Sequence, residues 1–471
     1  MLNKTKVVVT IGPATMEKEQ IKRLMVGGMD VARLNMSHAN YNFCKDVIEK
    51  IQELNEELHL SIATMIDLMG PEVRTGKFAN GEAYFRKGDK IRIYMDDITG
   101  DSTKFSVNYS GLIKDVSYNN IIKVKDGMMS FLVIDKKDDC IICEVLTDGV
   151  IENNQTVSVE GIKLNLPKMN NKDETDIIFA HKMNVDFLAL SYVCTQEDVL
   201  AVSDILIGLK NDHIGIISKI ETEEGVNNLD EIIRVSDGIM VARGDLGVDI
   251  PIERIPGVQK KIIEKCHKAG IVSIVATELL SSMEKTVRPT RAEVSDVANA
   301  VLDGADAVML SNETTVGKYP IETLGMMEKI INSAEKDIDY LEFIKNKESD
   351  TMDITSMISH SVVECASKLN CCAIIAPTMS GYTARKMSNC RPSCPVIAVS
   401  PNESTVKSLQ LHFAVNPVLI DDLKDFDKII EVSKKVTFEL ISTQPGDRII
   451  ITGGYPFKDV KSTNFMKIEE L

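Results

Sequence analysis

The sequence predicts a parallel (β/α)8 barrel with an inserted small β-barrel domain and a C-terminal α/β domain. Eight short apolar runs alternate with amphipathic helical stretches, a segment of different composition separates the third run from the fourth, and the alternation restarts near residue 370. Buried-type strands that alternate with helices are typical of parallel α/β sheets, and eight is the number of strands in the closed barrel. An open doubly wound sheet is the alternative.

The barrel strands are expected at residues 6–11, 31–35, 62–68, 185–193, 215–221, 238–245, 272–278 and 307–313. Between these runs, apolar residues recur at helical spacing at 17–26, 44–58, 196–209, 253–269 and 290–300. This order of strand and helix supports the barrel, since each helix then covers the outside of the strands that it connects.

Residues 75–167 have a different composition, rich in Gly, Asp, Asn and Lys, with short β-type runs at 90–95, 121–124, 131–134, 141–146 and 155–159. Turn pairs such as Asn80-Gly81 and Asp148-Gly149 recur between the runs. This pattern predicts a small β domain inserted after the third barrel strand. Because barrel active sites lie at the C-terminal ends of the strands, we expect the insertion to be a lid; an insertion without a role is the alternative.

Around residues 337–353 the chain becomes charged and loses its periodicity, and strand-like runs then return at 371–377, 395–400, 417–420 and 447–452. We therefore divide the chain into 1–76 (barrel, first part), 77–163 (lid), 164–340 (barrel, second part) and 341–471 (C-terminal domain).

Composition excludes several classes of protein. The chain has 471 residues and a net charge of -16, which argues against sequence-independent binding of nucleic acid or of an anionic membrane. Apolar runs stay shorter than the ~20 residues of a membrane-spanning helix, and the N-terminus lacks a signal-peptide pattern. Ten cysteines without paired zinc spacing predict core thiols in a reducing cytoplasm, and this includes Cys140 and Cys143.

Polar residues gather where the expected barrel strands end: Arg33, Asn35, Ser37, Asp67, Lys219, Glu221, Arg243, Asp245, Thr277, Glu278, Ser311 and Glu313. Alternate residues of a strand share a face, so we expect Lys219 to point with Glu221, Arg243 with Asp245, and Ser311 with Glu313. Each residue alone could be a solvated strand end or a structural ion pair. Polar groups at the ends of six strands predict a reactive site at the barrel mouth.

The residue types indicate the chemistry. Glu221 and Asp245 are hard oxygen ligands that suit Mg²⁺ or Mn²⁺ rather than zinc. Arg33, Arg74 and Lys219 add the cations that a phosphoryl group in transfer requires. Another oxygen-bearing group could bind a monovalent cation: Asn35, Ser37 and Asp67. The signatures of the commonest nucleotide-binding loops, zinc proteases and serine hydrolases do not occur.

The chain resembles the pyruvate kinase family over essentially its whole length. The matching stretches are TKVVVTIGPAT (5–15), GGMDVARLNMSHA (27–39), GPEVRTG (70–76), ISKIETEEGV (217–226), SDGIMVARGDLGVDIP (236–251) and RPTRAEVSDVANAVLDGADAVMLSNET (288–314). The resemblance implies the glycolytic transfer of a phosphoryl group from phosphoenolpyruvate to ADP, giving pyruvate and ATP. It also implies Mg²⁺ (or Mn²⁺) and K⁺ as cofactors, allosteric control by a phosphorylated effector, and a homotetramer.

The resemblance also implies roles for individual residues. Lys219 would stabilise the transferring phosphoryl group and the enolate, while Arg33 would contact the phosphate. The substrate carboxylate would be held by the Gly244 N–H and by Thr277, which would also lie on the path of the proton. The resemblance also implies two metal-binding groups: Glu221 and Asp245 would bind the divalent metal, and Asn35, Ser37, Asp67 and the Leu68 carbonyl would bind potassium. The nucleotide would be contacted by Asn35, His38 and Arg74. The effector phosphate would be bound by Thr378, Ser380, Gly381 and Thr383.

Four positions depart from the family pattern: Leu68-Met69 replaces Thr-Lys, Cys194-Thr195 replaces a basic pair, Glu278 replaces Gln, and Asn312 replaces Gly. These changes lie near the site and keep a second hypothesis open, a catalytically weakened paralogue that senses phosphorylated metabolites. A third hypothesis is another phosphoenolpyruvate-binding barrel enzyme, such as a mutase or aldolase relative. That reading does not explain Arg74, the potassium group, the lid or the C-terminal domain.

Overall fold

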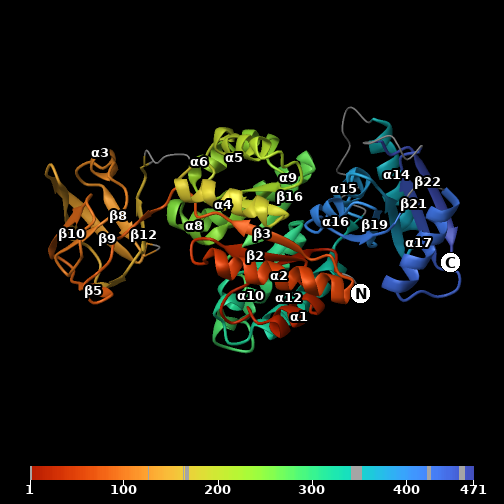
Figure 1. Ribbon diagram of the computed structural model, residues 1–471, viewed down its shortest axis with the longest axis horizontal. Helices are drawn as coiled ribbons and strands as arrows, with labels where there is room; N and C mark the ends of the chain where they lie inside the picture. The colour runs from red at the N-terminus through yellow and green to blue at the C-terminus, as the bar shows by residue number, and fades with distance from the viewer. Residues whose placement is uncertain are drawn as a thin grey trace.

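The computed structural model describes residues 3–125, 127–162, 164, 169–340, 353–421, 426–455 and 462–471. Figure 1 shows three bodies in a row, with the lid at one end, the barrel in the middle and the C-terminal domain at the other end. The predicted boundaries at residues 163 and 341 fall outside the described residues.

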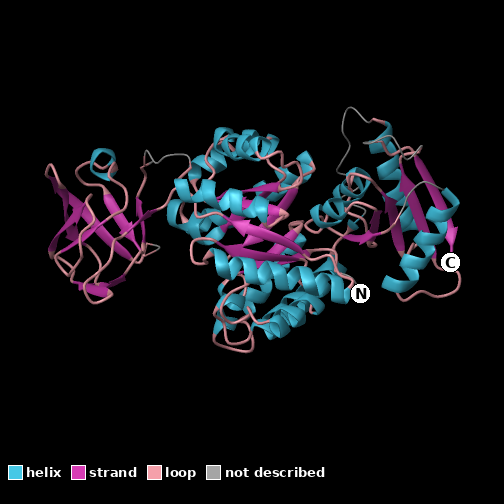
Figure 2. Cartoon of the chain, viewed as in Figure 1, coloured by secondary structure: helices cyan, strands magenta, loops and turns pink. Residues whose placement is uncertain are grey.

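Eight parallel strands form the closed barrel that the sequence predicts, in the order β1-β17-β16-β15-β14-β13-β3-β2. Their bounds are β1 Lys6–Thr10, β2 Val31–Asn35, β3 Ala63–Asp67, β13 Phe187–Leu190, β14 Gly215–Ile220, β15 Gly238–Ala242, β16 Val272–Ala276 and β17 Ala307–Leu310. Figure 2 shows these strands in the middle of the central body, with helices around them. The open-sheet alternative is therefore wrong.

The helices of the central body are α1 Lys18–Val26, α2 Tyr41–Leu58, α4 Asn171–Lys182, α5 Gln196–Gly208, α6 Glu223–Asn227, α7 Leu229–Arg234, α8 Arg243–Asp249, α9 Ile255–Ala269, α10 Arg291–Leu302, α11 Asn312–Thr315 and α12 Pro320–Ala334. Alternation within each strand separates two cores. In β1, Val7 and Val9 belong to the large cluster that includes the helices, whereas Val8 belongs to a separate cluster of strand residues. That second cluster fills the barrel and includes Leu411 from the C-terminal domain.

The lid contains a seven-stranded sheet in the order β4-β12-β8-β9-β10-β6-β7 and a separate pair, β11-β5. Its elements are β4 Val73–Arg74, β5 Glu82–Phe85, β6 Lys90–Tyr94, β7 Lys104–Ser106, α3 Leu112–Asp115, β8 Ile121–Val124, β9 Met129–Lys136, β10 Cys140–Val145, β11 Gly149–Glu152 and β12 Thr156–Val159. An isolated bridge between Thr75 and Val107, the residues that follow β4 and β7, links the two edges of this sheet. Four short strands, β4, β5, β7 and β11, are not predicted from the sequence.

The C-terminal domain has a five-stranded sheet in the order β20-β19-β18-β21-β22. Its elements are α14 Ile354–Lys368, β18 Ala373–Pro377, α15 Tyr382–Asn389, β19 Val396–Ser400, α16 Glu403–Ser408, β20 Val415–Leu419, α17 Phe426–Leu440, β21 Arg448–Gly453 and β22 Phe465–Glu470. β22 is the antiparallel edge strand and is not predicted from the sequence. Pro417 lies in the other edge strand, where a missing N–H costs little.

The C-terminal domain packs against the barrel through buried polar contacts as well as Leu411. Arg391 lies 3.0 Å from the Asp306 carboxylate, and both side chains are buried. Gln410 donates to the Ser61 carbonyl at 2.7 Å. All ten cysteines are free thiols. Within the described residues, helices are too short or too polar to cross a membrane.

Candidate active site

An ion-pair network joins three strands at the barrel mouth. Arg33 from β2 donates to Asp67 on β3, with its Nε 2.7 Å and its Nη2 2.6 Å from Asp67 Oδ2. Lys219 from β14 places its Nζ 3.2 Å from Asp67 Oδ1 and 3.0 Å from Glu221 Oε1. The strand order brings β2, β3 and β14 to the same end of the barrel, so the predicted convergence of these four residues is confirmed.

Burial makes the charges in this network strongly interdependent. Burial would raise the pKa of Asp67, but the nearby charges of Arg33 and Lys219 outweigh it and hold that pKa below its usual range. Burial would lower the pKa of Lys219, but Asp67 and Glu221 raise it. Lys219 is therefore an ammonium at neutral pH, able to stabilise negative charge and unable to act as a base.

Glu221 and Asp245 form the acidic side of the mouth. Glu221 follows β14 and is 1% exposed. Its Oε2 accepts the Tyr192 N–H at 2.6 Å, while Oε1 faces Lys219. Burial and the charge of Asp245 raise the pKa of Glu221, and Lys219 offsets this only in part. A buried carboxylate with a second carboxylate beside it favours a bound cation.

Thr277 and Gly244 meet where β16 and β15 end. The Gly244 N–H donates to Thr277 Oγ1 at 2.9 Å, so the threonine hydroxyl still has its own hydrogen to donate. Thr277 and Glu278 have φ values of 68° and 56°, a left-handed backbone that residues with a side chain rarely adopt. Such outliers cluster at functional sites, where surrounding contacts maintain them.

The residues of the expected potassium group are neighbours. Asn35 on β2 pairs in register with Asp67 on β3, and Asn35 Oδ1 accepts the Ser37 N–H at 3.0 Å. The Leu68 carbonyl accepts the Ser191 hydroxyl at 2.7 Å. Asp67 is already paired with two cations, which leaves mostly neutral oxygens at this position.

His38 and Arg74 lie toward the lid. Arg74 on β4 donates to Glu72 Oε2 at 2.7 Å and to the Asn154 carbonyl at 2.9 Å, so it is tied to the start of the lid. Burial lowers the pKa of His38, and the charges of Arg74 and Arg33 lower it further. The imidazole is therefore neutral at physiological pH.

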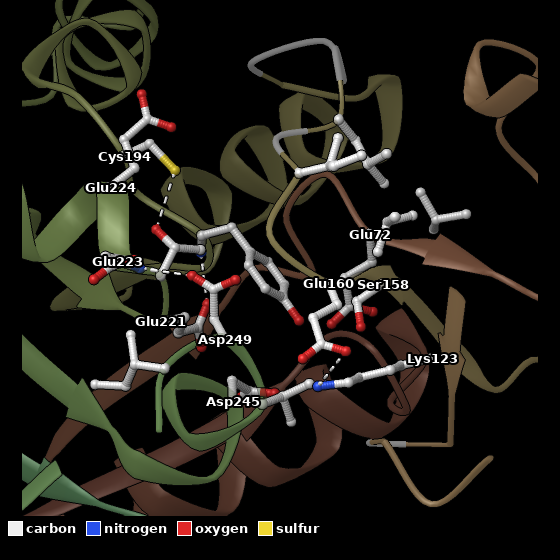
Figure 3. A pocket seen from close by; sticks show the side chains of 18 of the residues that line it. Glu72, Lys123, Ser158, Glu160, Cys194, Glu221, Glu223, Glu224, Asp245 and Asp249 are labelled. Atoms are coloured by element: carbon white, nitrogen blue, oxygen red, sulfur yellow. Dashed lines mark hydrogen bonds and ion pairs between the residues drawn. The ribbon is translucent and has the colours of Figure 1, made fainter. Parts of the chain in front are cut away.

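A cavity of about 1050 Å³ separates the barrel mouth from β12 of the lid. Figure 3 shows Glu221 and Asp245 on its barrel side, with Lys123, Ser158 and Glu160 on the lid side. Lys123 Nζ lies 3.7 Å from the Glu160 carboxylate. The described lining residues include one cation, Lys123, and nine carboxylates: Glu72, Glu160, Glu197, Asp198, Glu221, Glu223, Glu224, Asp245 and Asp249.

Two of the expected face-sharing pairs are wrong. β15 ends at Ala242, and helix α8 begins at Arg243, so Arg243 does not share a strand face with Asp245. Its guanidinium instead donates to the Thr277 carbonyl at 2.8 Å and pairs with Asp296 at 2.7 Å. β17 likewise ends before Ser311, and the Glu313 carboxylate accepts two backbone N–H groups, from Ser311 and Leu280. Arg243 and Glu313 therefore hold the mouth loops together.

The departures from the family pattern occupy different surroundings. Cys194 and Thr195 form the turn before α5, and both backbone N–H groups donate to Asp198 Oδ2. The Glu278 side chain is exposed, and its carbonyl accepts from Arg243. Asn312 is the first residue of the short helix α11 and does not have positive φ.

The predicted effector loop precedes α15. Gly381 has φ 78° and lies directly before the helix, where an added Cβ would approach Arg385 to 3.0 Å. The Arg385 guanidinium donates to the Ser380 carbonyl at 2.6 Å. Thr378 and Thr383 are buried, and the Thr383 hydroxyl lies 3.0 Å from that of Thr463. Ser380 is the partly exposed hydroxyl of the group.

Sequence reasoning missed Ser191 and Tyr192, which follow β13. Ser191 Oγ accepts from Lys219 Nζ at 2.7 Å, and Tyr192 donates its N–H to Glu221. The position of a serine at the end of the fourth strand is a signal that could have identified Ser191. The Tyr192 backbone contact has no sequence signal.

Comparison with known proteins agrees with this geometry. The family model described as the barrel domain of pyruvate kinase matches residues 2–324, and the model of its alpha/beta domain matches residues 356–469. A pyruvate kinase from Clostridium perfringens is 42% identical over 474 residues and covers 100% of both chains. One from Geobacillus stearothermophilus is 41% identical over 99% of this chain and 80% of its own length. The crystal structure of a pyruvate kinase from Cryptosporidium parvum superposes with a TM-score of 0.91 at 36% identity, covering 100% of this chain and 96% of the other.

Proposed function

Because this chain belongs to the pyruvate kinase family, whose reaction moves the phosphoryl group of phosphoenolpyruvate to ADP, we propose that the barrel mouth around Lys219 carries out that transfer. The observation that supports the assignment most strongly is the position of the Lys219 ammonium. It is 8% exposed, it lies within 3.2 Å of Asp67 and Glu221, and its pKa is raised. A buried, fixed positive charge stabilises charge that develops during transfer without the cost of reorganising solvent.

Arg33 is the second fixed cation. Its Nε and Nη2 bind Asp67, and its Nη1 donates to Thr10 Oγ1 at 2.9 Å. These bonds hold the planar guanidinium in one orientation, which suits contact with phosphate oxygens. We assign Arg33 to the phosphate and Lys219 to the moving charge between phosphate and enolate.

Gly244 and Thr277 are assigned to the substrate carboxylate. Because the Gly244 N–H already donates to Thr277 Oγ1, an incoming carboxylate oxygen would accept from the amide, from the threonine hydroxyl, or from both. The unusual backbone at Thr277 is supported by Arg243, whose guanidinium binds the Thr277 carbonyl. We also assign Thr277 to the path by which a proton reaches the enolate.

The family requires Mg²⁺ and K⁺, and the residues present fit both ions. Glu221 and Asp245 would hold the divalent ion, which would supply a charge that binds substrate oxygens. Within the described residues, three or more His, Cys, Asp or Glu side chains do not gather at one possible metal site, so substrate and water would complete the coordination. Asn35, Ser37, Asp67 and the Leu68 carbonyl would hold K⁺, and Asn35, His38 and Arg74 would contact ADP/ATP.

We further propose a cytoplasmic homotetramer that responds to a phosphorylated effector at Thr378, Ser380, Gly381 and Thr383. The ten free thiols support a reducing compartment. The backbone N–H groups before α15, which has eight residues, support an anion contact next to Ser380.

The test is a coupled assay of pyruvate formation with Mg²⁺ and K⁺. Steady turnover that requires phosphoenolpyruvate, ADP and Mg²⁺ supports the assignment. Tight binding of both substrates without turnover would instead identify the weakened, sensing paralogue, although the relatives reported above all bear the name pyruvate kinase.

A further inference from the structure

Ser191 lies between the ammonium of Lys219 and the loop that follows β3. Its Oγ is 2.7 Å from Lys219 Nζ and 2.7 Å from the Leu68 carbonyl, and 3.4 Å from Asp67 Oδ1. An ammonium can only donate, so the serine oxygen accepts from Lys219 and its single hydrogen is directed to Leu68. The hydroxyl therefore connects Lys219 to a backbone atom that side-chain motion cannot displace.

The next residue fixes the other functional group on β14. The Tyr192 N–H donates to Glu221 Oε2 at 2.6 Å, while Glu221 Oε1 binds Lys219. Tyr192 has φ 57°, a left-handed conformation that turns its N–H to this position. One two-residue turn thus contacts Lys219 through a side chain and Glu221 through the backbone.

The loop after β3 supports this turn. Gly70 has φ 75°, and a Cβ there would lie 2.9 Å from Ser191 Cβ and 3.0 Å from the Ser191 carbonyl oxygen. The Asn170 side chain donates to the Gly70 carbonyl at 2.9 Å, and the Asp173 carboxylate accepts the Gly70 N–H at 3.2 Å. Both residues belong to the start of α4, so a helix end holds the loop against Ser191.

We propose that Ser191 is a positioning residue that orients the Lys219 ammonium, and that the turn it forms with Tyr192 sets the spacing between Lys219 and Glu221. This inference depends on the proposed function, since it gives Ser191 a purpose only if Lys219 acts on the transferring group. A residue that supports a functional side chain in this way affects turnover more than substrate binding, because its contribution is precise geometry.

The experiment compares Ser191→Ala with Ser218→Ala in the coupled assay. Ser218 is a matched control: it is buried on β14 next to Lys219, and its hydroxyl bonds to Ser236 Oγ at 2.7 Å instead of to the site. We expect Ser191→Ala to lower kcat by ~10- to 100-fold, the range typical of lost supporting hydrogen bonds. The KM for phosphoenolpyruvate should change far less, and Ser218→Ala should retain wild-type kcat.

Ser191→Thr keeps the hydroxyl and should restore most of the rate, whereas Ser191→Cys, a weak hydrogen-bonding group, should behave like Ser191→Ala. These two variants carry the same comparison if the alanine variant does not fold. In a Lys219→Met background, Ser191→Ala should cause no further loss of kcat, because the group that it orients is absent.

Equal kcat for the Ser191→Ala and Ser218→Ala enzymes would overturn the inference, as would fully additive losses in the Lys219→Met background. The two levels of the argument remain separable. If Lys219→Met abolishes turnover while Ser191→Ala does not, only the role of Ser191 fails. If Lys219→Met itself leaves kcat unchanged, the proposed site fails.

Discussion

Replacement of Lys219 by methionine tests the central assignment. Methionine has similar length and removes the charge, so the change isolates the ammonium. A unit charge about 4 Å from developing negative charge contributes ~4 kcal/mol at an effective dielectric constant of ~20. Each ~1.4 kcal/mol of lost transition-state stabilisation is a factor of ten in rate. We therefore expect kcat to fall by ~10³-fold, with a much smaller change in the KM for phosphoenolpyruvate.

The same substitution leaves Asp67 and Glu221 without Lys219, and each is 1% exposed. Removing one partner of a buried ion pair costs ~3–5 kcal/mol, and Arg33 keeps the loss near the lower value by remaining paired with Asp67. The pKa of Glu221, already raised by burial, should rise further without Lys219. A raised carboxyl pKa in the folded state means that stability is lost as pH rises, so the melting temperature should fall more at pH 8 than at pH 5.

Lys6→Met is the matched control, because Lys6 is also a buried lysine on a barrel strand and lies 3.2 Å from Asp30. It begins β1, at the opposite end of the barrel from the site. This variant should lose thermal stability while keeping kcat. A Lys219→Met enzyme with normal kcat and a raised KM would refute the reasoning, since Lys219 would then bind substrate and transition state equally.

Four further predictions concern other parts of the chain. Glu72 is a half-buried carboxylate paired with Arg74, and Glu72→Lys should relax the requirement for K⁺. The measurement is the ratio of the rate in potassium to the rate in tetramethylammonium. Full activity of the wild-type enzyme without K⁺ would contradict the prediction. Thr195→Lys should lower the KM for ADP by up to ~5-fold, equivalent to ~1 kcal/mol, because it adds a cation to a cavity lined by carboxylates. An unchanged KM for ADP would mean that another cation already binds the nucleotide. At least one sugar phosphate or nucleotide monophosphate should lower the half-saturating phosphoenolpyruvate concentration, and Ser380→Asp should abolish that shift without changing kcat. If none of these compounds has an effect, the loop before α15 is an ordinary turn. Burial and neighbouring cations lower the pKa of His412 to about 3, so folding stability should be lost as pH falls below ~6.5, by up to ~2 kcal/mol at pH 5. Thermal melts should show a smaller loss for His412→Gln. An equal dependence of melting temperature on pH in both proteins would contradict this prediction.

Much of the barrel could be predicted from the sequence because each strand is a short, mostly apolar run. β1, for example, is KVVVT, with three consecutive valines, and it is buried along its whole length. The lid was harder, since β4 has two residues and β7 three, too short for a periodic signal. Their pairing depends on contacts between distant segments, such as the bridge from Thr75 to Val107. β22 was missed for a related reason: it is an edge strand, and its residues are partly or fully exposed, so the sequence lacks a buried apolar run.

At the site, strand alternation succeeded where the strand continues and failed where it stops. Lys219 and Glu221 converge because β14 runs to Ile220, so the period of two still applies. The same argument failed at Arg243, since β15 ends one residue earlier and the chain turns into α8. The sequence does not mark this difference, because both segments end with a charged residue, one intervening residue and a carboxylate.

The backbone geometry of the mouth was beyond sequence reasoning for a physical reason. Tyr192, Thr277 and Glu278 have positive φ, yet none is a residue type that favours the left-handed region. Their conformations are maintained by partners distant in the sequence: Glu221 accepts from Tyr192, and Arg243 binds the carbonyls of Thr277 and Glu278. The residues that hold these strained turns therefore support the geometry of the proposed site, and Arg243→Met should lower kcat by displacing Thr277, a loss that steady-state kinetics would measure.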